Sequence, residues 1–257
     1  MVDGKCKLII FLFAGILLLL PLFGIEQSDS STPERALVIA VYDGDTIKVR
    51  FASGCERKVR LIGIDSSEIE DPREEVKFQA LMSKRFTFSH LYRRIIGLTY
   101  DWEKEDKYKR VLAYVWTEKE GLFNKFILEE GFARVFRKFS FKYMKVFIEA
   151  ERKAREFNKG LWQKKPYPSI SPADTKKHID QVLSVEFLCS KVRIRGKYCF
   201  LCSPGDEFFA LVKQKNPLFL KDLRSYEGNT ICVEGLIEEY KGRPQIMVFF
   251  PSQIQQK

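Results

Sequence analysis

The chain has 257 residues, which is enough for more than one domain, and 45% of them are hydrophobic while 30% are charged. This composition excludes an intrinsically disordered chain and predicts a globular protein. Lys and Arg outnumber Asp and Glu by 44 to 34, so the formal net charge is +10. Such an excess favours a polyanionic partner, either nucleic acid or an anionic membrane surface. The alternative is a basic surface that serves only solubility.

Residues 1–25 are predicted to lie outside the fold. Lys5 and Lys7 precede a long apolar run, and this pattern is typical of an export signal. We therefore expect the protein to be exported, and thus secreted or periplasmic. No clear small-x-small cleavage site follows the run, so the alternative is an uncleaved membrane anchor formed by residues 8–25. Residues 26–34 are rich in Ser and are predicted to form an exposed linker.

Alternating apolar and polar residues after this linker predict three β-strands. The segments are residues 36–41, 47–51 and 59–64. Asp45 and Asp65 fall at strand ends, and Arg60 and Glu68 are close to them in the sequence. A hairpin built in this way can bring the two aspartates together.

The residue types in this hairpin suit one kind of chemistry. The carboxylates of Asp45 and Asp65, with a backbone carbonyl and waters, suit Ca²⁺, which takes roughly 6–8 oxygen ligands. The planar fork of Arg60 matches two phosphate oxygens. Glu68 is a candidate to take a proton from an attacking water. A hard cation, an arginine and a carboxylate base are the parts that phosphodiester hydrolysis needs.

Further elements follow in the same region. Helices are predicted at residues 74–91, 124–130 and 143–157, and strands at residues 95–102 and 111–116. Gly131 is expected to close the second helix in a left-handed conformation, and Gly160 ends the third.

Several motifs follow the acidic hairpin in a fixed order: Asp106 to Arg110 before a strand, then Gly131-Phe132-Ala133, and finally Gly160-Leu161-Trp162. Together they resemble the staphylococcal nuclease family over about residues 35–163. The resemblance implies a mainly β fold with helices (α+β), in which an OB-type five-stranded barrel carries three helices. It also implies cleavage of DNA and RNA with Ca²⁺ as cofactor.

The resemblance assigns roles to six positions. The implied Ca²⁺ ligands are Asp45, Asp65 and the backbone carbonyl of Ser66. The implied catalytic residues are Arg60 and Arg110, which would grip the scissile phosphate, and Glu68, which would be the general base. Glu70 and Asp71 are also near, although the spacing of Glu68 from Asp65 fits best.

The chain departs from the family pattern at two places. Ser66-Ser67 stand where the family commonly has Thr-Pro, so the turn lacks a stiffening proline. The family often has tyrosines near the nucleotide base, where this chain has Arg134 and Phe136. Together with Tyr108, these two residues are our candidates for substrate binding.

Residues 165–179 contain three prolines and are predicted to form a second linker. Beyond them, residues 180–257 hold five predicted strands and one plausible helix, residues 218–225, between the third and fourth. The strands are residues 182–189, 191–201, 207–213, 230–238 and 245–250. This order is typical of an OB-fold, so we expect a second, smaller OB-like barrel. Its end, residues 231–254, resembles small OB-type nucleic-acid-binding domains, and this resemblance covers about residues 180–255.

The surface of this second barrel could hold a single strand by stacking bases and pairing with phosphates. The available side chains are Phe187, Tyr198, Phe200, Tyr240, Arg193, Arg195, Lys197 and Arg243. The alternative is that these aromatic residues are core and that the barrel is structural or binds protein. Four cysteines (Cys189, Cys199, Cys202 and Cys232) are compatible with disulfides or with simple burial, and no metal is predicted there.

The sequence therefore predicts an exported, Ca²⁺-dependent nuclease acting on DNA, RNA or both, with single strands preferred. One alternative is a catalytically silent nucleic-acid-binding protein that uses two OB-type barrels. Another is a membrane-anchored scaffold that binds a different polyanion. His90 and His178 are not placed beside the predicted acids, so histidine chemistry is not expected, and no protein partner is inferred.

Overall fold

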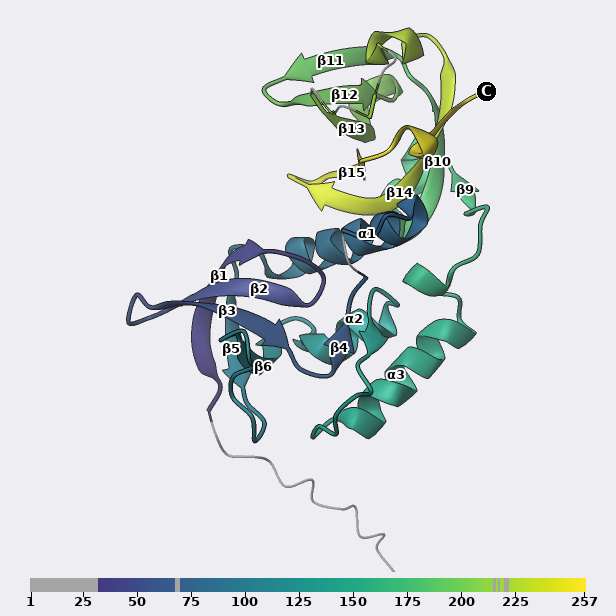
Figure 1. Ribbon diagram of the computed structural model, residues 1–257. Coiled ribbons are helices and arrows are strands. Elements are labelled where there is room, and N and C mark those ends of the chain that lie inside the picture. The colour runs from purple at the N-terminus through teal and green to yellow at the C-terminus, as the bar shows by residue number, and fades with distance from the viewer. Residues whose placement is uncertain (1–31, 68–69, 215, 217, 220–221) are drawn as a thin grey trace, which may run out of the picture. The chain divides into compact units, whose positions relative to one another are not determined.

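The computed structural model describes residues 32–257 apart from residues 68–69, 215, 217 and 220–221 (Figure 1). The predicted signal or anchor at residues 1–25, the first six residues of the linker 26–34, and Glu68 lie outside the described residues. No helix in the described part of the chain is long and apolar enough to span a bilayer.

Five strands close into a barrel. They are β1 (Glu34–Val41), β2 (Thr46–Phe51), β3 (Glu56–Leu61), β5 (Ile95–Thr99) and β6 (Val111–Thr117). Neighbours pair antiparallel in the order β3-β2-β1-β5-β6, and β3 then pairs parallel with β6. This closure confirms the predicted five-stranded OB-type barrel. The short strand β7 (Gly121–Leu122) extends the sheet beside β6.

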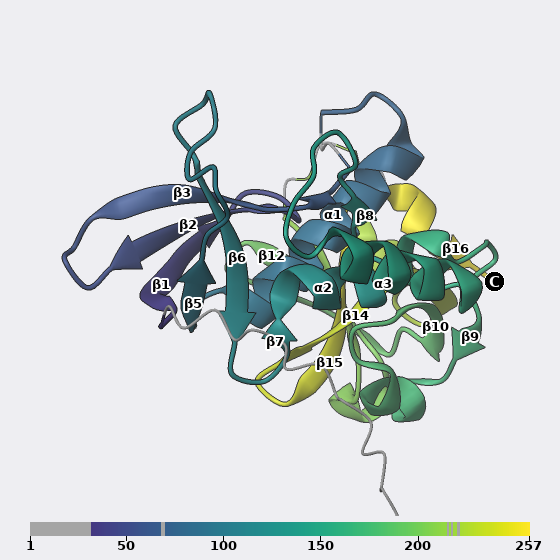
Figure 2. The same cartoon turned by 90° about the horizontal axis from the view of Figure 1, so that it is seen from below.

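Three helices accompany this barrel, as predicted: α1 (Glu74–Leu91), α2 (Phe123–Glu129) and α3 (Met144–Glu156). In α1, Phe78, Met82 and Phe86 are buried in the same cluster as the barrel core, which follows from their near-helical spacing. α2 and α3 lie side by side (Figures 1 and 2). Gly131 ends α2 with a φ of 76°, as expected for a left-handed cap.

A second set of strands forms another barrel. They are β10 (Val182–Leu188), β11 (Lys191–Arg195), β12 (Tyr198–Cys202), β13 (Phe209–Lys213), β14 (Thr230–Tyr240) and β15 (Arg243–Val248). The pairing order is β11-β12-β13-β15-β14-β10, and β13 runs parallel to β15. The short strands β9 (Ser169–Ile170) and β16 (Ile254–Gln256) pair with β10 and β14.

β10 and β11 act as one bent strand, because only two residues separate them. Cys189 N–H donates to the carbonyl of Asn229 before β14 (2.9 Å), whereas Ser190 N–H donates to the carbonyl of Cys202 in β12 (2.9 Å). The chain thus changes partner from one side of the barrel to the other at this point. The strand order therefore returns to its start, as in an OB-fold.

Two predictions for this barrel were wrong in detail. Residues 191–201 were expected to be one strand, but Gly196 has a φ of 59° and turns the chain between β11 and β12. Instead of an α-helix at residues 218–225, the described residues there form a 3-10 turn, Leu223–Tyr226. Further 3-10 turns are Gly160–Trp162, Pro172–His178, Pro204–Asp206 and Pro251–Gln253. The predicted linker 165–179 thus carries β9 and one of these turns.

Helix α1 also packs on the second barrel. Val182, Leu236 and Phe250 belong to the same buried cluster as the α1 residues. Leu236 N–H lies 3.2 Å from the sulfur of Met82, and Arg85 pairs with Glu238 of β14. The α1 helix therefore packs against the first barrel on one side and against the second barrel on the other.

Candidate active site

The turn between β1 and β2 is held in place by α1. Asp45 N–H donates to Oδ1 of Asp43 (2.9 Å), which forms an Asx turn. The carbonyl of Gly44 accepts a hydrogen bond from Oγ1 of Thr87 (2.7 Å). A Cβ on Gly44 would lie 2.8 Å from the Cβ atoms of both Ser66 and Ser83, so only glycine fits here.

Asp45 is the buried centre of the site, with 5% of its surface exposed. Its Oδ2 accepts a hydrogen bond from the backbone N–H of Ser66 (2.6 Å), and its Oδ1 accepts one from Oγ1 of Thr46 (3.0 Å). Asp45 therefore fixes the start of the segment that carries Ser66.

Arg60 joins the two aspartates. Its Nη1 lies 3.1 Å from Oδ1 of Asp45, and its Nη2 lies 3.1 Å from Oδ1 of Asp65. Nη1 also donates to the carbonyl of Ile64 (2.7 Å). The hairpin thus brings Asp45, Asp65 and Arg60 together, as its sequence pattern suggested.

The carboxylates crowd one another. Burial raises the pKa of Asp65, and the charge of Asp45 adds to this, while Arg60 opposes it. Burial and the charge of Asp45 likewise raise the pKa of Asp43 to about 6. Sequence reasoning gave Asp43 no role, although its place two residues before Asp45 was a signal. Raised pKa values mean that additional positive charge is favoured at this cluster.

The donor set fits Ca²⁺, which the family resemblance implies. Asp65 has a half-exposed side chain, and its Oδ2 accepts no hydrogen bond from any described residue. Together with Asp45 and the adjacent Ser66 carbonyl it offers only oxygen ligands, as a hard cation requires. Among the described residues, no three His, Cys, Asp or Glu side chains form a metal-binding group. The site would therefore depend on the carbonyl and on water as well as on carboxylates.

Arg110 reaches the same site from the loop before β6. Its Nε donates to Oδ2 of Asp106 (2.7 Å), and its Nη1 lies 3.5 Å from Oγ1 of Thr46, which also binds Asp45. Burial works to raise the pKa of Asp106, but hydrogen bonds from Arg110 outweigh it and lower that pKa. Asp106 is therefore an ionised anchor that orients the Arg110 guanidinium.

Comparison with known proteins places this arrangement in a family. The sequence profile described as "Staphylococcal nuclease homologue" matches residues 58–164. The chain is 37% identical to the thermonuclease of Staphylococcus hyicus over 126 residues, which cover 49% of this chain and 73% of that protein. It is 37% identical to the thermonuclease of Staphylococcus intermedius over 140 residues, or 54% and 82%. Endonuclease YncB of Bacillus subtilis is 30% identical over 128 residues, or 49% and 60%.

The chain belongs to the staphylococcal nuclease family. With this membership and with two arginines gathered at an acidic cluster, it is a hydrolytic nuclease of the staphylococcal nuclease type. The profile match ends at residue 164, so the second barrel lies beyond it.

The candidate bases differ in their surroundings. Glu68 lies outside the described residues. Asp71 is engaged by Arg73, whose Nη2 lies 2.8 Å from its Oδ2 and whose hydrogen bonds lower the pKa of Asp71 to about 2. Such a carboxylate is a weak base. Glu70 is exposed and remains an alternative, and Glu68 stays the predicted base.

The three predicted substrate-binding residues differ in their surroundings. Tyr108 is 67% exposed, and its ring lies 5.5 Å from the Arg110 guanidinium. Arg134 pairs with Asp65 across strands β4 (Ile64–Asp65) and β8 (Arg134–Val135), but its guanidinium lies over the ring of Trp162 at 5.1 Å. This contact orients the exposed Arg134 side chain, and its role in substrate binding stays a prediction.

Phe136 follows β8 and donates its N–H to the carbonyl of Gly63 (3.0 Å). Its ring contacts that of Phe139 (5.7 Å between centroids). Phe139 is 70% exposed, and sequence reasoning missed it. The sequence feature that could have indicated Phe139 is its position three residues after Phe136, in a segment rich in Lys and Arg.

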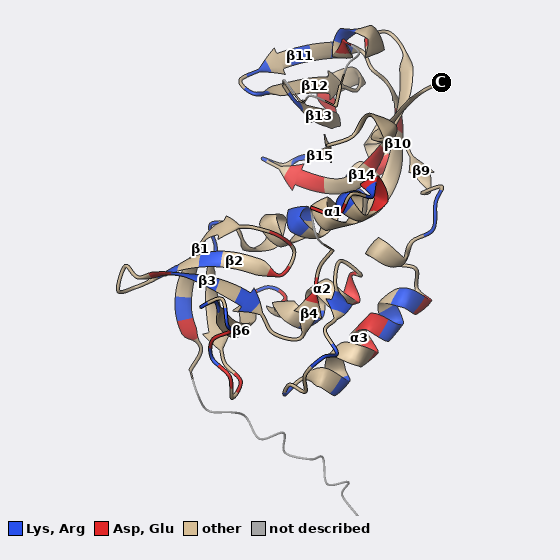
Figure 3. Ribbon diagram, in the orientation of Figure 1, with Lys and Arg blue, Asp and Glu red and all other residues tan. Residues whose placement is uncertain are grey.

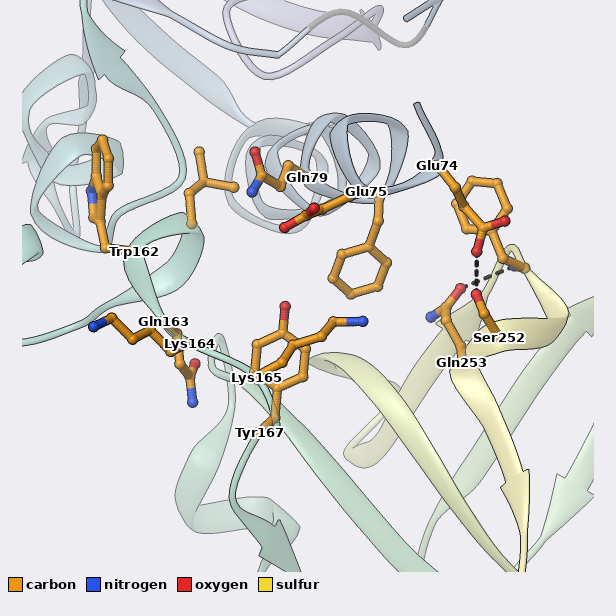
Figure 4. A pocket seen from close by; sticks show the side chains of 13 residues that line it. Glu74, Glu75, Gln79, Trp162, Gln163, Lys164, Lys165, Tyr167, Ser252 and Gln253 are labelled. Atoms are coloured by element: carbon orange, nitrogen blue, oxygen red, sulfur yellow. Dashed lines mark hydrogen bonds between the residues drawn. The ribbon is translucent and has the colours of Figure 1, made fainter. Parts of the chain in front are cut away.

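A pocket of about 560 Å³ involves none of the predicted site residues (Figure 4). It is lined by the start of α1, by residues 161–165 and Tyr167, and by the turn at residues 250–253. Its charged side chains are Glu74, Glu75, Lys164 and Lys165. The mixed charge does not suit a polyanion, and the pocket marks the seam between α1 and the second barrel.

Proposed function

We propose that the protein is an exported, Ca²⁺-dependent nuclease that hydrolyses phosphodiester bonds of DNA, RNA or both, with single strands preferred. The observation that carries this proposal is the placement of Arg60 between the carboxylates of Asp45 and Asp65. An arginine held in this way presents a fixed fork beside the oxygens that suit a hard cation.

The chain's own residues have separable roles in this mechanism. Asp45, Asp65 and the Ser66 carbonyl would hold Ca²⁺, which neutralises charge on the phosphoryl oxygens. Arg60 would exchange its hydrogen bond to the exposed Asp65 for hydrogen bonds to the phosphate, while the buried Asp45 keeps it oriented. Arg110, anchored by Asp106, would donate to the phosphate from its own side.

The remaining parts of the proposal rest on sequence and on exposed side chains. Glu68 is the proposed base that takes the proton of the attacking water. Export rests on the pattern of residues 1–25, with an anchor at residues 8–25 as the alternative. The single-strand preference is supported by the exposed rings of Tyr108 and Phe139, because unpaired bases can stack on aromatic faces.

Cleavage of single-stranded DNA by the purified chain, with Ca²⁺ or with EGTA, tests this proposal. Arg60→Ala and Arg110→Ala should each lower kcat about 10²–10³-fold, as expected when a transition-state donor is removed. Arg60→Lys keeps the charge but loses the fork, so it should also be impaired. Glu68→Gln removes the carboxylate that would accept the proton of the attacking water, so it should also lower kcat if Glu68 is the base.

Arg152→Ala is the matched control, because Arg152 also contacts two carboxylates, Glu149 and Glu156, on the solvent face of α3. It should keep full activity. Undiminished turnover by the Arg60 and Arg110 variants would refute the assignment. Binding without cleavage under every divalent ion would favour the catalytically silent alternative.

A further inference from the structure

One face of the second barrel carries apolar side chains on its outside. In β12, Cys199 and Leu201 are buried in the barrel core, so the alternate residues face outward. Strand register places Arg193, Phe200, Leu211 and Met247 in one row across β11, β12, β13 and β15. After its arginine, this row is entirely apolar.

The next row strengthens the same surface. Register aligns Cys202 with Phe209, and the rings of Phe209 and Phe200 meet edge to face at 6.1 Å. These residues form a hydrophobic cluster separate from the barrel core. We call this cluster the outer platform; its members are Phe200, Cys202, Phe209, Leu211 and Met247. Cys202, Phe209 and Leu211 are themselves buried, whereas Phe200 and Met247 are partly exposed, so the accessible apolar surface of the platform lies at Phe200 and Met247. The outward side of a strand is normally polar, and a partly exposed aromatic ring there is open to a stacking partner.

Cations surround the outer platform. They are Lys191, Arg193 and Arg195 on β11, Lys197 in the following turn, Lys213 at the end of β13 and Arg243 at the start of β15. Figure 3 shows blue at the end of β11 and through the turn into β12. Arg193 and Arg243 lie over the ring of Phe209 at 5.6 and 5.7 Å.

These cations are mostly without a counter-charge. Of the six, only Arg193 forms an ion pair with a described carboxylate, at 2.8 Å from Asp206. The arginines of α3 differ, because Arg152 and Arg155 both pair with glutamates on their own helix. Uncompensated cations gathered around aromatic rings favour a ligand that has both negative charge and planar groups.

Single-stranded nucleic acid has both properties. Its phosphates match the cations and its unpaired bases match the rings, whereas the bases of a duplex are hidden and an acidic peptide lacks them. Along β13, the stretch from Phe209 of the platform to the cation Lys213 spans about 13 Å, at roughly 3.3 Å per residue, which suits a few nucleotides. An exposed tyrosine, Tyr240, ends β14 opposite Arg243, and Lys241 lies in the turn between them.

We propose that the outer platform and its surrounding cations bind single-stranded DNA or RNA and retain the strand that the nuclease cleaves. The face lies on the second and third strands of the barrel, where OB-folds hold oligonucleotides. That the retained strand is also the substrate rests on the proposed function. The binding itself does not require cleavage.

Binding is tested with the full chain in EGTA by fluorescence anisotropy of a labelled 16-residue oligothymidylate. Arg195→Glu/Lys197→Glu should raise Kd at least tenfold, and the salt dependence should become shallower by about 1.4, or about 0.7 for each lost phosphate contact. Phe200→Ala should raise Kd at least fivefold through lost stacking. The control, Lys145→Glu/Lys176→Glu, makes the same charge change at two exposed lysines and should alter Kd less than twofold.

Folding of each variant is checked by its melting temperature. The Arg195/Lys197 pair lies at an exposed turn, so it remains a sound test if Phe200→Ala does not fold. An unchanged Kd in the folded platform variants overturns the proposal. Equal losses of heparin and oligothymidylate binding in the charge variant, with no effect of Phe200→Ala on either, would indicate a general polyanion site and also overturn it.

Cleavage assays in Ca²⁺ separate this proposal from the proposed function. The platform variants should raise KM for long single strands while turnover of a dinucleotide is unchanged. If the wild type cleaves nothing but the variants still lose binding, the nuclease proposal fails and the binding site stands. If the wild type cleaves normally and the platform variants change neither KM nor Kd, the binding proposal is rejected while the nuclease proposal stands.

Discussion

Arg85 and Glu238 form a two-pronged ion pair across 153 residues of sequence, with Nε of Arg85 2.6 Å from Oε1 of Glu238. The pair joins α1 of the nuclease barrel to β14 of the second barrel. Glu238 is only 2% exposed. Burial raises the pKa of Glu238, while the hydrogen bonds and charge of Arg85 oppose that rise.

Arg85→Ala should lower the free energy of unfolding by about 3–5 kcal/mol at pH 7, because it leaves a buried carboxylate without its partner. Urea denaturation measures this loss. Without Arg85 the folded-state pKa of Glu238 stands above its unfolded value, so the variant loses stability as pH rises through and above the unfolded pKa near 4.5. The difference from wild type should therefore be smaller at pH 4 than at pH 7. Arg152→Ala, which breaks exposed ion pairs, should lose far less; an equal loss would contradict a special role for the buried pair.

Gly44→Ala should reduce both stability and activity. The new Cβ would press on Ser66 and Ser83 at 2.8 Å, and Ser66 N–H binds Asp45. We expect a loss of about 1–3 kcal/mol from overpacking and at least a tenfold lower kcat. Gly54→Ala is the control, since that glycine has a φ of 84° but no atom within 4 Å of the added Cβ. It should lose stability through backbone strain while its kcat stays normal.

Ca²⁺ should raise the melting temperature of the wild-type chain. At a concentration 100 times its Kd, a ligand of the folded state adds about 2.7 kcal/mol to stability. Asp65→Asn should abolish this increase without unfolding the protein, because the Asp65 side chain is half exposed. Asp174→Asn, on the 3-10 turn Pro172–His178, should leave it intact. An increase that persists in Asp65→Asn would exclude Asp65 as a ligand.

Glu151→Gln should destabilise the protein at neutral pH. Glu151 of α3 is 2% exposed and pairs with Arg137 and Arg155, and it accepts the N–H of Val135 at 3.3 Å. Burial acts to raise its pKa, but these hydrogen bonds outweigh it and lower the pKa below the ordinary 4.5. The stabilisation is therefore present above pH 4.5 and is lost as pH falls through the folded-state value.

We expect a loss of about 1–3 kcal/mol at pH 7, typical of a buried hydrogen-bonded carboxylate. Thermal melts from pH 7 to pH 3 should show the two proteins converging. A constant difference across this range would mean that the ionised form of Glu151 contributes nothing.

Short-range sequence patterns predicted those elements whose structure is determined by residues close together in the sequence. The helix at residues 74–91 has the predicted bounds because its apolar residues recur at near-helical spacing. The cluster of Asp45, Asp65 and Arg60 followed from strand periodicity in a single hairpin. Arg110 and the role of Ser66 instead came from resemblance to the nuclease family.

Features that depend on distant partners could not be predicted in this way. The pair of Arg85 and Glu238 joins residues that share no local pattern. The turn at Gly196 interrupts residues 191–201. Apolar and polar residues alternate before and after this turn, so periodicity alone predicted a single strand. Phe139 became a candidate only when its exposure and its contact with Phe136 were seen.

Helix α1 limits how far this enzyme can be trimmed. On one side its Thr87 holds the turn between β1 and β2 that carries Asp45, and on the other its Met82 and Arg85 contact β14. A chain cut after residue 164 would end where the family match ends, but it would expose apolar surface of α1 and leave Arg85 without Glu238. Engineering a shorter enzyme would therefore require redesign of this helix face, with polar residues in place of those that the second barrel covers.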